Sequence, residues 1–168
     1  MRNIDLRKNE VRANIASSSS EIEVLELLAR DDFKSIRRNV ATNLHSTYSI
    51  LKYLSKDEDL YVRICVAQNP STSAEILDFL SKDRDDRVRF EVAQNPNTSG
   101  ATLDYLSNDK HPVIRRNVAI NRNTWTKTLA GLAEEVNDLE TRYFIAYNTN
   151  TPKDVREKLK KCLHIYGE

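Results

Sequence analysis

The chain is poor in glycine and proline, with three and four residues respectively in a length of 168. Sheets built on many tight turns use both residue types at those turns, so their scarcity argues against a β-sandwich or β-barrel and favours helices. Cysteine is also scarce. Cys65 and Cys162 lie far apart and form no CxxC pair, so we expect a reducing, cytoplasmic compartment.

Long apolar runs are missing as well. The opening segment, MRNIDLRKNEVRANI, has no apolar stretch of signal-peptide length, and no segment approaches the roughly 18 apolar residues of a membrane-spanning helix. The net charge is only +1, which gives no strong field to attract nucleic acid or an acidic membrane. We therefore expect one water-exposed domain without membrane contact, long enough to bury a sizeable core.

What the chain does contain is a repeat. Residues 88–109 read VRFEVAQNPNTSGATLDYLSND, and residues 62–83 read VRICVAQNPSTSAEILDFLSKD. Alignment on the residue before a recurring arginine gives six copies, and self-similarity of this kind is the signature of a repeat architecture. The copies begin at Val11, Ile36, Val62, Val88, Ile114 and Thr141.

Each copy contains two short amphipathic segments. In VRFEVAQN, Val88 and Val92 are spaced to lie on one helical face, and Leu103 and Leu106 do the same in TSGATLDYLS. The NPNT sequence between them ends the first helix, and we expect Thr98 to cap the second. One such pair cannot bury its own apolar stripe, so stacked neighbours must share a core.

The sequence therefore predicts an all-α fold, an α-solenoid of about six two-helix repeats that forms a single domain over residues 1–168. Residues 11–152 hold the repeats. Residues 1–10 depart from the repeat and are predicted to form an N-terminal cap. Residues 153–168 contain the amphipathic segment KDVREKLKKCLHIY and are predicted to form a C-terminal capping helix.

The phrase V-R-x-x-V-A-x-N-P-x-T-S, followed by L-x-x-L-S-x-D, resembles the leucine-rich repeat variant family and, more distantly, HEAT-type repeats. The resemblance covers roughly residues 11–163 and is closest over 62–87 and 88–113. It implies a right-handed superhelix of paired short helices, one type of which can take 3₁₀ geometry. One branch of the family carries a cysteine-rich iron–sulfur segment that has no counterpart here, so we expect no cofactor.

An arginine is the second residue of every copy, and in four copies an aspartate stands six positions before it. Because the arginine fork bonds two acceptors at once, we interpret this as a structural ladder in which each arginine bridges a loop carboxylate of its own or the next copy. A row of phosphate-binding guanidiniums is the alternative. The ladder residues are Arg37, Arg63, Arg89 and Arg115 with Asp31, Asp57, Asp83 and Asp109.

An asparagine recurs near the end of the first helix. Asparagine tolerates left-handed backbone geometry at helix ends and bonds nearby backbone groups, so we expect a second structural ladder. Its members are Asn43, Asn69, Asn95 and Asn121.

The positions that change between copies are the candidates for partner binding. A row exposed only to water would be uniformly polar, whereas this one holds aromatic, aliphatic and arginine side chains, which are enriched at protein interfaces. Some of them, Phe144 especially, can instead turn into the core. The candidate row comprises Arg38, Ile64, Phe90, Arg116, Ile120, Tyr143 and Tyr147.

No HExxH, GxSxG, P-loop or metal-spaced Cys/His set is present. The leading hypothesis is a non-enzymatic scaffold that binds a protein or peptide. The alternatives are a nucleic-acid-binding repeat protein and, with no distinct motif in its favour, an enzyme of the DNA-base-repair type. Trp125 is interpreted as packing across a repeat junction. The basic residues of the nucleic-acid alternative are Arg38, Arg84, Arg87, Lys110, Arg116 and Arg122.

Overall fold

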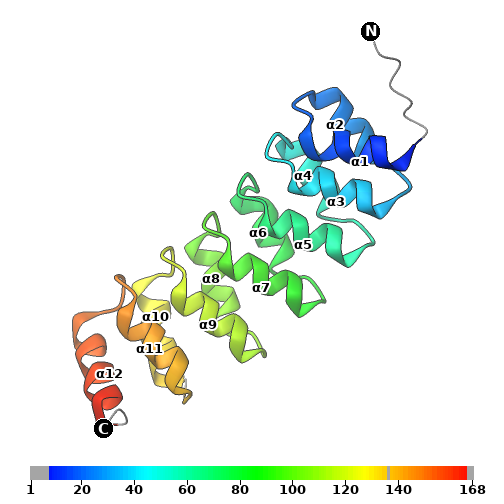
Figure 1. Ribbon diagram of the computed structural model, residues 1–168. Coiled ribbons are helices and arrows are strands. Elements are labelled where there is room, and N and C mark those ends of the chain that lie inside the picture. Colours follow the sequence, from blue (N-terminus) through cyan, green and yellow to red (C-terminus); the bar gives the residue numbers. More distant parts are fainter. Residues whose placement is uncertain (1–7, 136, 166–168) are drawn as a thin grey trace. The chain divides into compact units, whose positions relative to one another are not determined.

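The computed structural model describes residues 8–135 and 137–165, and over these ranges the chain is all-α, with twelve helices and no strand (Figure 1). The predicted all-α class and the packing in consecutive helix pairs are confirmed. The helices are α-helical, and the 3₁₀ geometry implied by the family resemblance is absent from the described residues. Tightening is limited to helix ends, where for example the Asn95 N–H donates to both Glu91 O and Val92 O.

The helices group into two compact units, Met1–Leu80 and Ser81–Glu168. The expectation of one domain over residues 1–168 stays a prediction. Unit 1 contains three helix pairs, in which the first helices α1, α3 and α5 pack side by side and each contacts the second helix that follows it. These helices are α1 (Asn9–Ser18), α2 (Ile22–Leu28), α3 (Lys34–Thr42), α4 (Tyr48–Leu54), α5 (Leu60–Gln68) and α6 (Ala74–Leu80).

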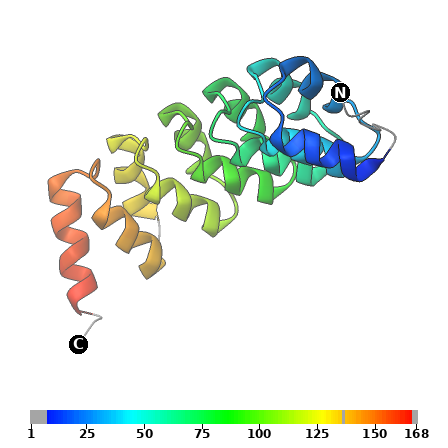
Figure 2. The same cartoon turned by 45° about the horizontal axis from the view of Figure 1, so that its top comes forward.

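Unit 2 repeats this arrangement with α7, α9 and α11 as neighbouring first helices, as two views show (Figures 1 and 2). After the last pair, α12 packs against both α10 and α11. The helices of this unit are α7 (Asp86–Gln94), α8 (Gly100–Leu106), α9 (Pro112–Ile120), α10 (Thr126–Glu135), α11 (Leu139–Tyr147) and α12 (Lys153–Ile165).

The two predicted end segments are placed differently. Helix α12 lies over residues 153–165 of the predicted C-terminal cap, and residues 166–168 are outside the described residues. Of the predicted N-terminal cap, residues 1–7 are also outside them. Asn9 and Glu10 form the first turn of α1 and so belong to the first repeat.

The core of each unit lies between the layer of first helices and the layer of second helices. Val88, Val92, Leu103 and Leu106, the predicted core of the fourth copy, are all fully buried. The same positions are buried in the other internal copies, for example Val62 and Leu77. The predicted apolar faces are therefore confirmed, and burial of these side chains is the main stabilising contribution to the stack.

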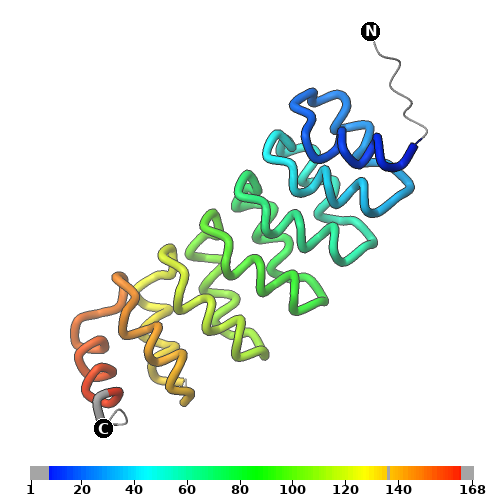
Figure 3. The backbone as a smooth tube through the Cα atoms, viewed as in Figure 1, coloured from blue at the N-terminus to red at the C-terminus, as the bar shows by residue number. Residues whose placement is uncertain are grey.

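The turn between paired helices corrects one prediction. Thr98 is fully buried, and its hydroxyl donates to Val92 O at 2.6 Å, so it closes the end of α7. The N-cap of α8 is the next residue, Ser99, which accepts from the Thr102 N–H. The hydroxyl bond recurs in the corresponding turns of the second, third, fifth and sixth pairs, whose short connections can be followed in Figure 3. Its other donors are Ser46, Thr72, Thr124 and Thr151.

Candidate functional site

The repeated arginines form a ladder with carboxylates of their own copies, and the carboxylate is not that of the aspartate six residues before the arginine. The carboxylate partner follows the arginine in the next loop: Arg37 Nε donates to Asp57 at 2.6 Å, and Arg89 Nε donates to Asp109 at 2.6 Å. Arg12 bonds Asp31 in the same way. The aspartate six residues earlier contributes its backbone carbonyl, which accepts from Nη1 of Arg37, Arg63, Arg89 and Arg115. Arg37 and Arg89 therefore each connect two loops. Each bonds a backbone carbonyl in the loop before its helix and a carboxylate in the loop that follows its helix pair.

These ion pairs are mostly shielded from water. The Arg89 and Asp109 side chains are 10% and 7% exposed. The hydrogen bond to Asp109 raises the pKa of Arg89. Burial alone would raise the pKa of Asp109, but the hydrogen bonds from Arg89 and from the His111 N–H outweigh it, so this pKa is lowered. Both groups are thus held charged, as a structural role requires.

The asparagine ladder connects each copy to the one before it. Asn121 Nδ2 donates to Ala93 O at 2.9 Å and to Asn95 O at 3.1 Å, while its Oδ1 accepts from the Asn123 N–H. Asn43, Asn69 and Asn148 make equivalent bonds to their preceding copies. The left-handed geometry expected for these residues is not used: Asn95 has φ −65° and ψ 129°. The extended backbone is what directs the amide toward the neighbouring copy.

In unit 1, the candidate row is occupied by internal contacts. Arg38 donates through Nε and Nη2 to Asp59, the N-cap residue of α5, and its guanidinium lies 4.6 Å from the Tyr61 ring centroid. Burial alone would raise the pKa of Asp59, but bonds from Arg38 and Lys34 lower it. Ile64 is half-buried. Arg38 therefore stabilises the start of α5, the first helix of the next pair.

Arg116 has the corresponding role in unit 2. Its Nη2 lies 2.6 Å from Glu140 and 3.9 Å from Asp138, the N-cap of α11. Its Nε is buried, with no hydrogen-bond partner among the described residues. Phe90, one pair earlier, is half-buried on α7. Neither residue is fully available to a partner.

The exposed part of the candidate row is an aromatic patch, which we define as Ile120, Tyr143 and Tyr147. These side chains are 49%, 48% and 58% exposed and come from the neighbouring helices α9 and α11. The ring centroids of Tyr143 and Tyr147 are 4.5 Å apart, and Lys160 Nζ lies 4.7 Å from the Tyr147 ring centroid. The patch is thus apolar and aromatic, with a cation at its edge.

A second row of exposed apolar residues was not anticipated from the sequence. It lies on the second helices and comprises Leu27, Tyr53 and Phe79 in unit 1 and Tyr105 in unit 2. Arg30 lies 4.7 Å from the Tyr53 ring centroid and Lys56 5.9 Å from that of Phe79. The sequence did contain a signal for this row. An aromatic residue stands directly before the second leucine in L-x-Y-L and L-x-F-L, at a position that the repeat pattern leaves unspecified.

Cavities recur beside this row. One of about 420 Å³ is lined by Tyr53, Arg37 and Asp57, and an equivalent one of about 400 Å³ is lined by Tyr105, Arg89 and Asp109. Because the ladder ion pairs form their walls, the charges that line them are already partly neutralised. These cavities recur because the side chains that line them occupy equivalent positions in different copies.

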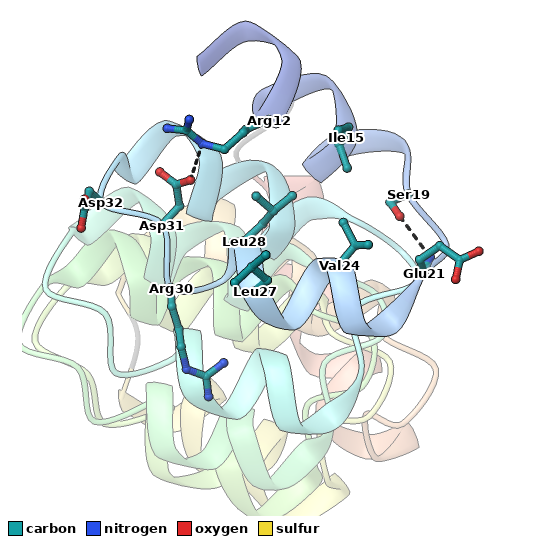
Figure 4. A pocket seen from close by; sticks show the side chains of 10 residues that line it. All are labelled: Arg12, Ile15, Ser19, Glu21, Val24, Leu27, Leu28, Arg30, Asp31 and Asp32. Atoms are coloured by element: carbon teal, nitrogen blue, oxygen red, sulfur yellow. Dashed lines mark hydrogen bonds and ion pairs between the residues drawn. The ribbon is translucent and has the colours of Figure 1, made fainter. Parts of the chain in front are cut away.

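A groove of about 740 Å³ lies between α1 and α2, and we call it the N-terminal groove (Figure 4). Its floor is apolar and its rim is charged. The floor residues are Ile15, Val24, Leu27 and Leu28, and the other lining residues are Arg12, Ser19, Glu21, Arg30, Asp31 and Asp32.

No protein-family model matches this chain, and no curated protein sequence matches it. Over the described residues, no helix is both long and apolar enough to cross a bilayer. No group of three or more His, Cys, Asp or Glu side chains in those residues is arranged to hold a metal ion.

Proposed function

We propose that this protein is a non-enzymatic scaffold that binds a protein or peptide through the aromatic patch of unit 2. The observation that supports this proposal is the exposure of Ile120, Tyr143 and Tyr147 on neighbouring helices. Tyrosines carry a large apolar body with a polar tip, and they lose little conformational entropy when a partner covers them. Aromatic residues are also enriched among those that contribute most to binding energy.

The proposal places the binding site in unit 2 and gives the arginines of the candidate row a supporting role. Arg38 and Arg116 bond carboxylates at the start of the first helix in the next pair, α5 and α11 respectively, which supports a part in ordering the helices. Ile64 and Phe90 are half-buried, so each offers only part of its side chain to a partner.

The alternative of nucleic-acid binding has less support. Phosphate binding needs cations whose charge is not already compensated. Arg38, Arg87 and Arg116 each pair with an aspartate or glutamate. These are three of the six basic residues on which that alternative rests, so we rank it second.

Two finer points belong to the same proposal. The family resemblance supports a right-handed superhelix of the leucine-rich repeat variant type, and the consecutive helix pairs are compatible with it. The sparse cysteine content supports a cytoplasmic location.

Affinity purification with quantitative mass spectrometry tests the proposal. The Tyr143→Ser/Tyr147→Ser variant should lose a set of co-purifying proteins, while the matched control Tyr105→Ser, on the second helix α8, should retain them. Circular dichroism melting should be alike for both. An unchanged set of partners in the double variant would contradict the proposal. Binding of a labelled DNA duplex that weakens steeply with salt would favour the alternative instead.

A further inference from the structure

We propose that the N-terminal groove binds one amphipathic helix of a partner protein, and that this helix carries lysine or arginine on both sides of its apolar stripe. The groove is separate from the aromatic patch, so the two proposals stand or fall independently. Leu27, on the groove floor, is 67% exposed beside the half-buried Ile15 and Val24. Contiguous apolar surface with a charged rim is typical of an interaction site.

The repeat itself shows which kind of structure covers such a face. Val40 and Ile50, which occupy the positions of Ile15 and Val24 one copy later, are 0% and 2% exposed. In that copy α3 packs against both α1 and α2, so helices of the preceding pair cover the face. The first pair has the same apolar positions without that cover from any described helix.

Unit 2 shows that a single helix is sufficient to cover an end face. Helix α12 packs alone on α10 and α11, with Leu159 buried and Lys153, Lys158 and Lys161 exposed. It is amphipathic, with its lysines directed to solvent. Helix α12 packs on the side of a pair where a following pair would pack, and the groove is on the side of a preceding pair, so α12 shows that this fold can cover the face of a pair with one amphipathic helix.

The charges at the rim specify the partner further. Arg12 and Asp31 neutralise each other at 2.6 Å, and Arg30 donates to Glu26 O and lies over Tyr53. The exposed carboxylates of Glu21 and Asp32 have no ion pair with a described residue, and they stand at opposite sides of the groove (Figure 4). Three carboxylates (Glu21, Asp31 and Asp32) against two guanidiniums (Arg12 and Arg30) give the lining a net charge of −1. This net negative charge, with carboxylates at both sides of an apolar floor, is complementary to basic residues flanking an apolar stripe.

The test uses the full chain and two fluorescein-labelled synthetic peptides measured by fluorescence anisotropy. Both peptides are designed as helices with the same leucine stripe, flanked by lysines in one and by glutamates in the other. The lysine peptide should bind with a Kd of roughly micromolar order, the range expected of a weak specific contact. Leu27→Asp should weaken it at least about tenfold. Leu44→Asp, which changes a leucine that is 64% exposed and does not line the groove, should leave it unchanged.

Amide chemical-shift mapping on the wild-type chain gives a second measurement that does not depend on folding of the variants. Shifts gathered over residues 12–32 support the proposal, and shifts gathered elsewhere overturn it. Equal affinity for Leu27→Asp and Leu44→Asp, or tighter binding of the glutamate peptide, also overturns it. Sedimentation showing a dimer that Leu27→Asp dissociates would assign the groove to a second copy. Tighter peptide binding by Ile4→Ser/Leu6→Ser would assign it to the chain's own first residues.

Discussion

Two glycines allow the same substitution to be made in opposite environments. A Cβ atom on Gly131, inside α10, would have no heavy atom within 4 Å. A Cβ atom on Gly100, at the start of α8, would lie 2.1 Å from Nε1 of Trp125. The indole therefore packs against the backbone of the preceding copy, as the sequence interpretation of Trp125 expected, and the missing side chain of Gly100 makes this packing possible.

The expected free energies follow from these environments. Gly131→Ala removes backbone freedom from the unfolded chain without a clash, so it should raise the free energy of unfolding by about 0.5–1 kcal/mol. Gly100→Ala forces the indole out of its position, and overpacking of this kind costs about 1–3 kcal/mol. For a chain of this length, each kcal/mol corresponds to roughly 2–4 °C in Tm.

Urea unfolding followed by circular dichroism measures both variants, and Trp125 is the only tryptophan in the sequence, so its fluorescence reports on the local change. Gly100→Ala should shift the emission to longer wavelength, and Gly131→Ala should not. Trp125→Ser introduces serine, the residue at the corresponding position of the preceding copy, Ser99. In a chain that carries Trp125→Ser, Gly100→Ala should lower the free energy of unfolding much less than it does in the wild-type chain. Equal stability of Gly100→Ala and Gly131→Ala would refute this reasoning.

Three further predictions concern the ladders and turns. Asn121→Ala removes two bonds to the preceding copy and should lower the free energy of unfolding by about 2–4 kcal/mol, against less than about 0.5 kcal/mol for the exposed Gln94→Ala, both by urea titration. Asp109 has a lowered pKa in the folded state, so its stabilising contribution is complete above the unfolded pKa and is lost as pH falls through the folded value. The Tm should therefore drop on acidification from about pH 5, and Asp109→Asn should reduce that dependence; an identical pH profile would disprove it. Thr98→Val leaves the Val92 carbonyl without its hydroxyl donor and should cost about 1–2 kcal/mol by the same titration; no change would exclude a structural role for the bond.

Helix type, copy boundaries and core faces were predictable because they depend on patterns within one copy. The spacing of Val88 and Val92, and of Leu103 and Leu106, is enough to define two buried faces. The carboxylate partner of Arg89 was not predictable from the sequence, because one aspartate stands six residues before it and another twenty residues after it. Only the three-dimensional path of the loops decides which carboxylate it reaches.

The candidate site was predictable in part. Variability between copies led to Ile120, Tyr143 and Tyr147, which are exposed, but also to Arg38 and Arg116, which bond neighbouring carboxylates. Sequence variability marks positions that are free of the repeat's constraints, and it does not distinguish a residue facing solvent from one facing the next helix. The N-terminal groove left no sequence signal, because its residues match the core pattern and differ only in that no described helix packs over them.

The asparagine ladder has a consequence for how such a chain changes over generations. Asn121 recognises its neighbour through the carbonyl oxygens of Ala93 and Asn95, which every amino acid at those positions would supply. Nothing in the bond depends on which copy comes before. Duplication or deletion of a whole copy within a unit therefore leaves each ladder asparagine with backbone acceptors. The number of copies can change by recombination, and the exposed residues can diverge independently of that change.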